Sequence, residues 1–396
     1  MAGFHVTANL NIDWLHQERG ESIMKQTLSI LCLLTAAFLA FGCSQNDVVQ
    51  PEGTQVADVG LDKGAASNAQ PRFHTMHWPP PYYAPGVMKL DKNTGEGTHV
   101  TDLDIALAPP GWPGEYPGFV TPYGIAFDVD GTAYSLNNWF DGVPEDCFSQ
   151  LIKMDLETGA TWPIGPVHDI NFAGPEFDAC GNLWATGFTV GPPEGGPIYV
   201  WGDSYLYRID KNTGEKTQIG DTGHTEWMDL DFDSDGRLWG TFGNDLYIID
   251  TETGASEFIT HVDGVEDNRI PGVCEEDWEY MEIMGIAFDH RDVLWATAMK
   301  GFSYCEEGGL AVPVMTVDID AGTATLVGSS ILDGQSHGGD IPPKTVNVCH
   351  RQENGSYKSI EVSLSALAAH LAHGDMLPQA DGNGCGCPQG GRSARK

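Results

Sequence analysis

Positive charge is scarce in this chain of 396 residues. Lysine and arginine together number 20, against 56 aspartates and glutamates, so the formal net charge is −36. Proteins bind nucleic acids and anionic lipid surfaces through clustered basic side chains, and a net charge of this sign opposes both contacts. The composition therefore argues against a nucleic-acid partner and against direct adsorption to an anionic membrane.

An apolar run long enough to cross a membrane comfortably is also missing. The run from Leu28 to Phe41 has fourteen residues, whereas a transmembrane helix needs about 20. Met24-Lys25 precedes this run and Gly42-Cys43 follows it, which is typical of a secretory signal peptide. We predict a signal region over residues 1–43 with its true start at Met24; a transmembrane anchor is the weaker alternative.

The end of the run, Ala40-Phe41-Gly42-Cys43, resembles the lipobox of bacterial lipoproteins, in which the cysteine is acylated and becomes the first residue of the mature chain. The resemblance implies lipidation at Cys43, a cell-envelope location, and membrane contact through the lipid anchor only. Ser44 after the cysteine favours the outer membrane if the cell has one. The polar, aperiodic residues 44–73 are then a flexible tether.

Common catalytic signatures are absent as well. The sequence holds no nucleophile elbow, Walker loop, dinucleotide fingerprint or His-Glu-x-x-His zinc helix. No catalytic residue can be assigned from a motif, which favours a protein that is not an enzyme.

Glycine is abundant, with 49 residues, and much of it belongs to a repeated turn. In this turn an aspartate is followed four residues later by a glycine, between two runs that alternate apolar and polar residues. Such a pattern is typical of a β-hairpin. The copies span residues 91–95, 155–159, 210–214, 250–254 and 318–322. Five copies of one unit indicate a repeat protein.

A second marker alternates with this turn: Phe-Asp, with Tyr or Trp seven residues after the phenylalanine. It begins at Phe127, Phe177, Phe232 and Phe288. Each repeat thus holds two hairpins, and four antiparallel strands at this period are the mark of a β-propeller blade. The pattern resembles the quinoprotein-like and NHL-like propellers of bacterial surface proteins over residues 74–343. We predict an all-β propeller of four-stranded antiparallel blades. Five blades fit best and four or six are alternatives, because residues 329–343 are too short for a fifth inner hairpin.

Blade topology divides the connections between two faces. The turns between the first and second strands and between the third and fourth strands are short. The other connections vary in length and share the opposite face, at residues 101–123, 137–149, 187–204, 260–283 and 298–312. Functional insertions gather where a rigid scaffold tolerates them, so we expect an unknown ligand or protein partner on this long-loop face.

The same topology sorts the cysteines of the exported chain. Cys274 and Cys305 lie on the long-loop face of one blade, and we predict a disulfide between them. Cys147 and Cys180 lie on opposite faces, which excludes a bridge between them.

The innermost strands predict a cation site on the axis. Small residues dominate there, but Glu176, Asp229 and Asp231 replace them in adjacent blades. Clustered carboxylates repel one another unless a cation or proton joins them, so we predict Ca²⁺ in the channel. Calcium-dependent lactonases of the gluconolactonase type are similar in having a channel site, but their full ligand set has no match here.

Residues 344–379 are predicted to form a small ββα module, and residues 380–396 a disordered tail. In the module Cys349 and His350 lie on a strand, while His370 and His373 share one helix face, which suggests a Zn²⁺ site. The alternative is a disulfide from Cys349 to Cys385 or Cys387. The Cys-His … His-Leu-Ala-His-Gly-Asp stretch resembles a short module appended to many secreted bacterial proteins.

These observations predict an exported, lipid-anchored propeller that acts as a binding or scaffold module at the cell surface. The alternative is a metal-dependent, lactonase-like hydrolase that works through the channel carboxylates.

Overall fold

The computed structural model describes residues 73–78, 85–106, 119–140, 147–191, 200–265, 281–300, 312–330, 335–381 and 384–386. All of them belong to the compact unit Asn68–Lys396, which is distinct from the unit Met1–Ser67. The predictions for Cys43 and for the Cys274–Cys305 disulfide lie outside the described residues. Among the residues described, no helix is both long and apolar enough to span a membrane.

The repeated turn forms the outer hairpin of each blade because its side chains bond to their own backbone. In the copy at residues 250–254, Asp250 Oδ1 accepts the N–H groups of Glu252 (2.8 Å) and Thr253 (3.0 Å). Gly254 then takes the positive φ of 81° that closes the turn. Asp91, Asp155 and Asp210 make the same pair of bonds.

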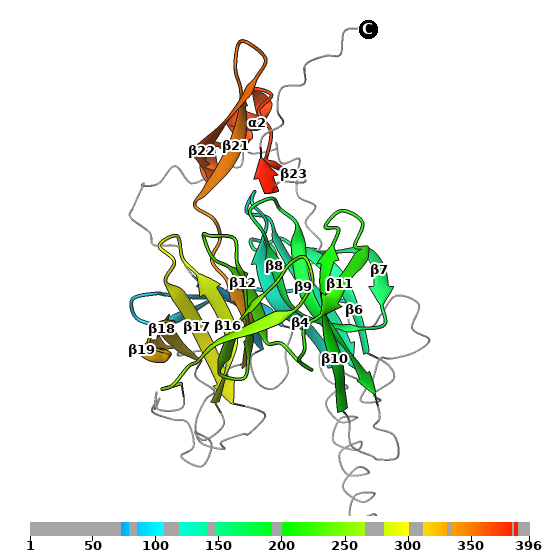
Figure 1. Ribbon diagram of the computed structural model, residues 1–396, viewed down its shortest axis with the longest axis vertical. Coiled ribbons are helices and arrows are strands. Elements are labelled where there is room, and N and C mark those ends of the chain that lie inside the picture. The colour runs from blue at the N-terminus through cyan, green and yellow to red at the C-terminus, as the bar shows by residue number, and fades with distance from the viewer. Residues whose placement is uncertain are drawn as a thin grey trace, which may run out of the picture. The chain divides into compact units, whose positions relative to one another are not determined.

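Twenty strands form five four-stranded antiparallel sheets, whose strands are named from the axis outward (Figure 1). The first sheet is β20 (Gln335–Asp340), β1 (Phe73–Trp78), β2 (Gly86–Leu90) and β3 (Gly97–Asp102). The second is β4 (Phe119–Phe127), β5 (Ala133–Phe140), β6 (Cys147–Met154) and β7 (Thr161–His168). The third is β8 (Asn171–Phe177), β9 (Leu183–Gly191), β10 (Val200–Ile209) and β11 (Lys216–Asp221).

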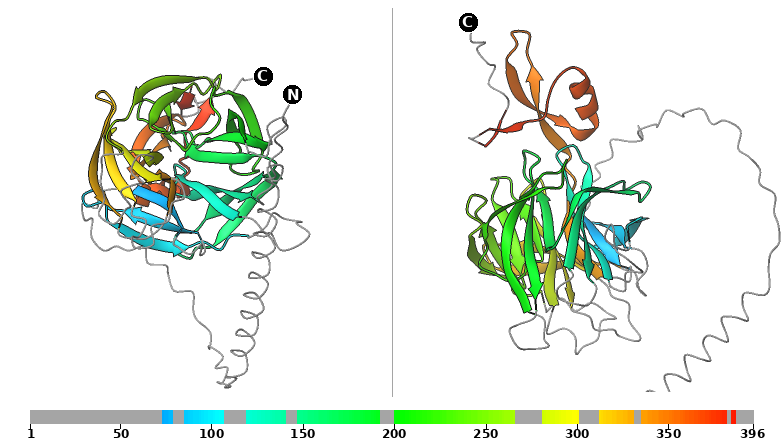
Figure 2. Two further views of the ribbon diagram at one scale, coloured as in Figure 1. Left: turned by 90° about the horizontal axis from the view of Figure 1, so that it is seen from below. Right: turned by 90° about the vertical axis from the view of Figure 1, so that its right-hand side faces the viewer.

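The fourth sheet is β12 (Asp229–Phe232), β13 (Leu238–Phe242), β14 (Asp245–Ile249) and β15 (Ser256–His261). The fifth is β16 (Met281–Phe288), β17 (Leu294–Lys300), β18 (Pro313–Asp318) and β19 (Thr323–Ser329). The innermost strands contact one another in the cyclic order β20, β4, β8, β12, β16 and back to β20. The left view of Figure 2 shows the five sheets arranged around this common axis. The five-bladed propeller predicted from the repeats is confirmed.

The first blade takes its innermost strand from the far end of the propeller. β20 pairs with β1, with Asp340 opposite His74 and Gln335 opposite Trp78. Residues 329–343, which by themselves are too short for a fifth inner hairpin, supply one of its two strands. The sequence pattern does not reveal this pair of strands because β1 and β20 stand at opposite ends of the propeller sequence. Their pairing closes the ring.

The loop boundaries on the long-loop face also need correction. The sequence pattern assigns residues 137–149 and 187–204 to loops, but β5 continues to Phe140 and β6 starts at Cys147. Likewise β9 continues to Gly191 and β10 starts at Val200. Antiparallel pairing persists along these arms, so the strands are longer than the repeat pattern predicts.

The second marker caps the inner hairpins. Asp233 Oδ2 accepts the indole N–H of Trp239 at 2.8 Å, and Asp178 does the same for Trp184 at 3.1 Å. A separation of six residues from aspartate to tryptophan therefore places the indole against the turn. Hydrophobic cores fill the spaces between neighbouring blades, as where Trp239 packs with residues of β16 and β17.

The C-terminal module consists of β21 (Thr345–Arg351), β22 (Tyr357–Ser363) and α2 (Leu364–Ala372). Its small core of Val346, Val348 and Leu367 is extended by Val129 from the β4–β5 turn of the propeller. Two short strands follow, β23 (Gln379–Asp381) and β24 (Gly384–Gly386), so part of the stretch predicted as disordered is a paired hairpin.

Candidate functional site

The innermost strands bring one equivalent position of each blade to the axis. In each blade this position pairs with the second residue of the adjacent strand of the same sheet. That second residue is Tyr or Trp in four blades and His74 in the first. The occupants of the axial position, in order around the ring, are Asp340, Ala126, Glu176, Asp231 and Ala287. Three of the five blades thus direct a carboxylate to the axis.

These carboxylates meet. One oxygen from each of Glu176, Asp231 and Asp340 lies within 4.8 Å of the other two. All three residues are buried, with exposed fractions of 5%, 5% and 7%. We call this group the axial cluster. It contains two of the three predicted channel ligands, and its third member is Asp340 in place of Asp229.

Backbone amides of neighbouring blades hold two of the three carboxylates. Asp340 accepts the N–H of Phe127 at 2.6 Å, and Asp231 accepts the N–H of Phe288. Burial raises the pKa of Asp340 to about 6, although the bonds from the N–H groups of Phe127 and Ile341 act in the opposite direction. Burial, followed by repulsion from Asp340, also raises the pKa of Asp231. The cluster therefore resists carrying its full negative charge without compensation.

Glu176 is the member that keeps one carboxylate oxygen without a partner among the described residues. Its Oε2 is buried and has no hydrogen-bond partner in the part of the chain that the structure describes. Burial raises the pKa of Glu176 well above its ordinary value, and the charges of Asp340 and Asp231 raise it further. A buried, unpartnered carboxylate oxygen is costly, which a bound cation or a proton would relieve.

Asp229 has a different role from the one predicted. Its Oδ2 accepts the N–H groups of Ile286 (2.8 Å) and Gly339 (2.9 Å), so it joins the backbones of the fifth and first blades to the fourth. The other blades have glycine at this level, and a Cβ on Gly338 would lie 2.5 Å from the Cα of Gly124. The innermost strands thus approach one another closely at this level.

This level of close approach lies between the axial cluster and the long-loop face. Along each innermost strand the chain runs from the long-loop face toward the short turns, and Asp229 precedes Asp231. The cluster consequently lies on the short-turn side of this level.

A second acidic group lies on the long-loop side. Burial and repulsion by Glu282 raise the pKa of Glu226 to about 7. The Tyr123 hydroxyl donates to the Sδ of Met228 at 3.6 Å, and burial raises its pKa. The repulsion between Glu226 and Glu282 indicates that two carboxylates lie close together on this side as well.

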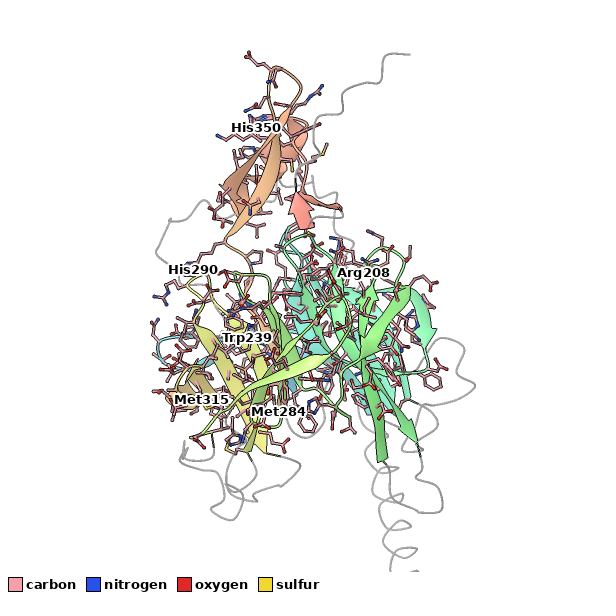
Figure 3. The ribbon with its side chains drawn as sticks, in the orientation of Figure 1. Arg208, Trp239, Met284, His290, Met315 and His350 are labelled. Carbon is pink, nitrogen blue, oxygen red and sulfur yellow. The ribbon has the colours of Figure 1, made fainter. Side chains whose placement is uncertain are left out.

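In the C-terminal module the predicted zinc ligands are only partly assembled. His350 Nδ1 and His370 Nδ1 each lie 2.8 Å from the same oxygen of Asp375, Oδ2 (Figure 3 labels His350 on β21). Cys349 is disulfide-bonded, so its sulfur is not available as a thiolate ligand and that part of the prediction is wrong. His373 lies one turn away, with its ring 6.4 Å from that of His370.

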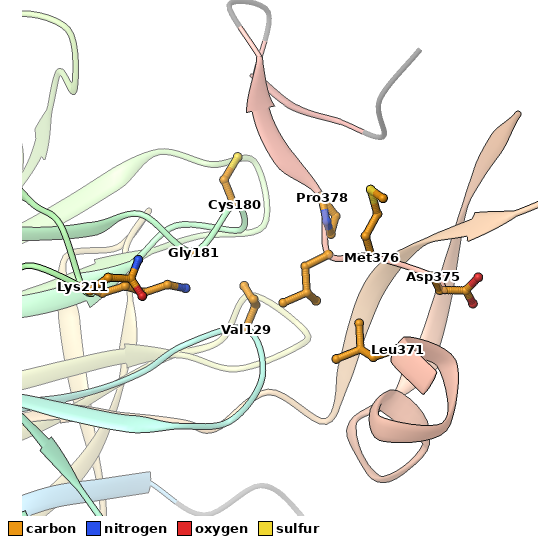
Figure 4. Close-up of a pocket in the computed structure, with 10 residues that line it drawn as sticks. Val129, Cys180, Gly181, Lys211, Leu371, Asp375, Met376 and Pro378 are labelled. Atoms are coloured by element: carbon orange, nitrogen blue, oxygen red, sulfur yellow. The ribbon is translucent and has the colours of Figure 1, made fainter. Parts of the chain in front are cut away.

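Cys180 is disulfide-bonded as well. The partner of Cys180 is not Cys147, as the topology requires. Cys180 lines a cavity of about 520 Å³ together with Val129, Leu371 and Met376 (Figure 4). The carboxylate of Asp375 points away from this cavity, toward the histidines.

Comparison with known proteins gives little beyond the architecture. No protein-family model and no curated protein matches this sequence. Among solved structures, TolB from Acinetobacter baumannii superposes with a TM-score of 0.35 at 13% identity, over 74% of this chain and 61% of that one. The chain therefore spans about three fifths of the length of that TolB structure.

Two further structures give similar values. A puromycin hydrolase superposes with a TM-score of 0.31 at 13% identity, over 76% of this chain and 44% of the hydrolase. A protein of unknown function from Bacteroides caccae gives 0.32 at 9% identity, over 69% of this chain and 99% of that one. Similarity at this level carries no argument about function, so the function must be argued from the residues.

Proposed function

We propose that this chain is an exported β-propeller, anchored at the cell envelope through lipid on Cys43, that acts as a binding module and uses Ca²⁺ as a structural ion on its axis. The observation that supports the ion most directly is the buried, unpartnered Oε2 of Glu176 beside Asp231 and Asp340. The support for export and lipidation is the signal-like segment that ends in Gly42-Cys43.

The donor set of the axial cluster suits Ca²⁺. Carboxylate oxygens are the ligands that this ion prefers, and one oxygen from each of the three residues lies within 4.8 Å of the other two. Mg²⁺ demands a near-ideal octahedron and retains several waters, which a buried cluster accommodates poorly. Ca²⁺ is therefore the ion we propose.

A structural role suits the cluster better than a catalytic one. Each carboxylate is at most 7% exposed, and two of them accept amide bonds from the next blade. A hydrolytic metal needs an open coordination position that a substrate can reach. An ion bound here would join the first, third and fourth blades, and the ligand-binding surface would lie elsewhere on the propeller.

The hydrolase alternative makes a different prediction for the same residues. A lactonase-like enzyme would lose turnover after EDTA treatment and in the Glu176→Gln variant. A binding module with a structural ion would show no lactone hydrolysis in any form. Its calcium-loaded chain would melt at a higher temperature than the EDTA-treated chain, and also at a higher temperature than Glu176→Gln with calcium. Lactone turnover by the calcium-loaded chain that disappears with EDTA would replace our proposal with the alternative.

The envelope location has its own test. Mass spectrometry of the protein extracted from membranes should find a mature N-terminus at Cys43 that carries diacylglycerol. An unmodified N-terminus elsewhere in residues 44–73 would contradict lipid anchoring while leaving the axial ion untouched.

A further inference from the structure

Side chains that can ligate a metal meet in the C-terminal module from three separate segments. His350 comes from β21, His370 from the last turn of α2, and Asp375 from the segment that bridges back to β21. One ligand atom of each lies within 4.8 Å of the other two. We propose that His350, His370 and Asp375 form a Zn²⁺ site with one coordination position open to solvent.

The donor set and its spacing fit zinc. Two imidazoles and a carboxylate are common zinc ligands, and a site with three protein ligands keeps its fourth position for water or an incoming group. Both histidines now donate from Nδ1 to Asp375 Oδ2 at 2.8 Å. Ligand atoms around tetrahedral zinc are about 3.3 Å apart. Binding therefore requires these contacts to widen by about half an ångström and the two donated protons to leave.

The surrounding bonds hold the three side chains in place without the ion. Asp375 Oδ1 accepts the N–H of Arg351 at 3.0 Å, and the Asp375 side chain is only 1% exposed. The N–H of Asp375 donates to the carbonyl of His370 at 3.2 Å, while that of Cys349 donates to Met376 at 2.7 Å. Such supporting contacts fix ligand orientation and increase metal affinity.

The site is reachable from solvent. The side chains of His350 and His370 are 44% and 25% exposed, whereas the carboxylate between them is buried. An ion can therefore enter from the histidine side and retain a water there. The exposed His373 lies outside the group of three, so it provides a matched control on the same helix end.

The test is a zinc titration of residues 44–396, the exported chain without its lipid-bearing Cys43, measured by calorimetry at pH 7.5. The chain carries Glu176→Gln, so zinc on the axis is not counted. We expect one saturable zinc site that weakens at least tenfold in Asp375→Asn and in His370→Ala, and changes less than threefold in His373→Ala. Asparagine retains one oxygen, which can accept both histidine bonds, while its amide nitrogen replaces the oxygen that accepts the Arg351 N–H. A thermal melt therefore checks that the Asp375→Asn variant keeps the fold.

Several outcomes would overturn the site. The parent chain could bind no zinc, or Asp375→Asn could bind it with unchanged affinity. A loss in His373→Ala as large as that in His370→Ala would place the ion on the helix pair instead. Should His370→Ala fail to fold, Asp375→Asn and the parent chain decide the matter by themselves.

Discussion

Single carboxylates in this propeller have roles that follow from their surroundings. Glu226 has a pKa raised to about 7 because burial and the charge of Glu282 disfavour its ionised form. The folded state therefore binds a proton that the unfolded state has already lost, and stability falls as the pH rises from about 4.5 through 7.

The Glu226→Gln variant tests this directly. Glutamine cannot ionise, so we expect the variant to melt at a higher temperature than the parent at pH 8 and at nearly the same temperature at pH 5. Thermal melts across this range provide the comparison. The exposed Glu257→Gln substitution on β15 is the control and should leave the pH profile unchanged. A parent profile that rises between pH 6 and 8 would contradict the assignment.

Asp229 supports a second prediction at this scale. Alanine at this position would leave the buried N–H groups of Ile286 and Gly339 without an acceptor, at a cost of about 1–3 kcal/mol for each. Asparagine keeps one oxygen and should retain most of the stability. Urea unfolding of Asp229→Ala and Asp229→Asn measures this difference. Equal stability of both variants would show that the two hydrogen bonds to Asp229 contribute nothing to the stability of the fold.

The sequence reveals some of these residues and hides others. Glu176 and Asp231 could be predicted because they follow the repeated spacing before a phenylalanine. Asp340 could not, since Ile341 stands where the marker phenylalanine would be and β20 has no local partner. Asp375 is also invisible in the sequence pattern: its carboxylate joins the two histidines only after the chain turns back onto β21.

At the scale of the element, the repeated turn both closes a hairpin and packs against a neighbouring blade. The positive φ of its glycine explains the local requirement, which the sequence shows plainly. The contact with the preceding blade could not be foreseen. A Cβ on Gly254 would lie 2.6 Å from the carbonyl of Gly220 on β11, so the turn packs backbone against backbone.

Two glycine substitutions separate these effects. Gly254→Ala and Gly236→Ala introduce the same side chain at similar φ values, 81° and 78°. A Cβ on Gly236 meets nothing within 4 Å, whereas one on Gly254 collides with the neighbouring blade. We expect Gly254→Ala to be less stable than Gly236→Ala by about 1–3 kcal/mol, the usual cost of overpacking. Equal denaturant midpoints would mean that the blades tolerate a wider spacing.

At the scale of the molecule, ring closure and the axial cluster belong together. β20 closes the first blade and delivers Asp340 to the axis, beside carboxylates from the third and fourth blades. The repeats predict five blades and the all-β class, because each hairpin carries its own turn chemistry. They do not predict closure, which depends on a pairing between the two ends of the ring.

An ion on the axis would couple these distant segments. A ligand that binds only the folded state stabilises it by about 2.7 kcal/mol at a concentration 100-fold above its Kd. The stabilisation should disappear when the cluster loses its unpartnered carboxylate. The same substitution removes a buried charge, so in the absence of calcium Glu176→Gln should be at least as stable as the parent chain.

Calcium titration of chelator-treated residues 44–396, the exported chain without its lipid-bearing Cys43, tests the central claim most directly. We expect one Ca²⁺ per chain by calorimetry, a higher melting temperature with calcium, and loss of both effects in Glu176→Gln but not in Glu257→Gln. Calcium binding that persists in Glu176→Gln, or a parent chain that binds no calcium at millimolar concentration, would contradict the account.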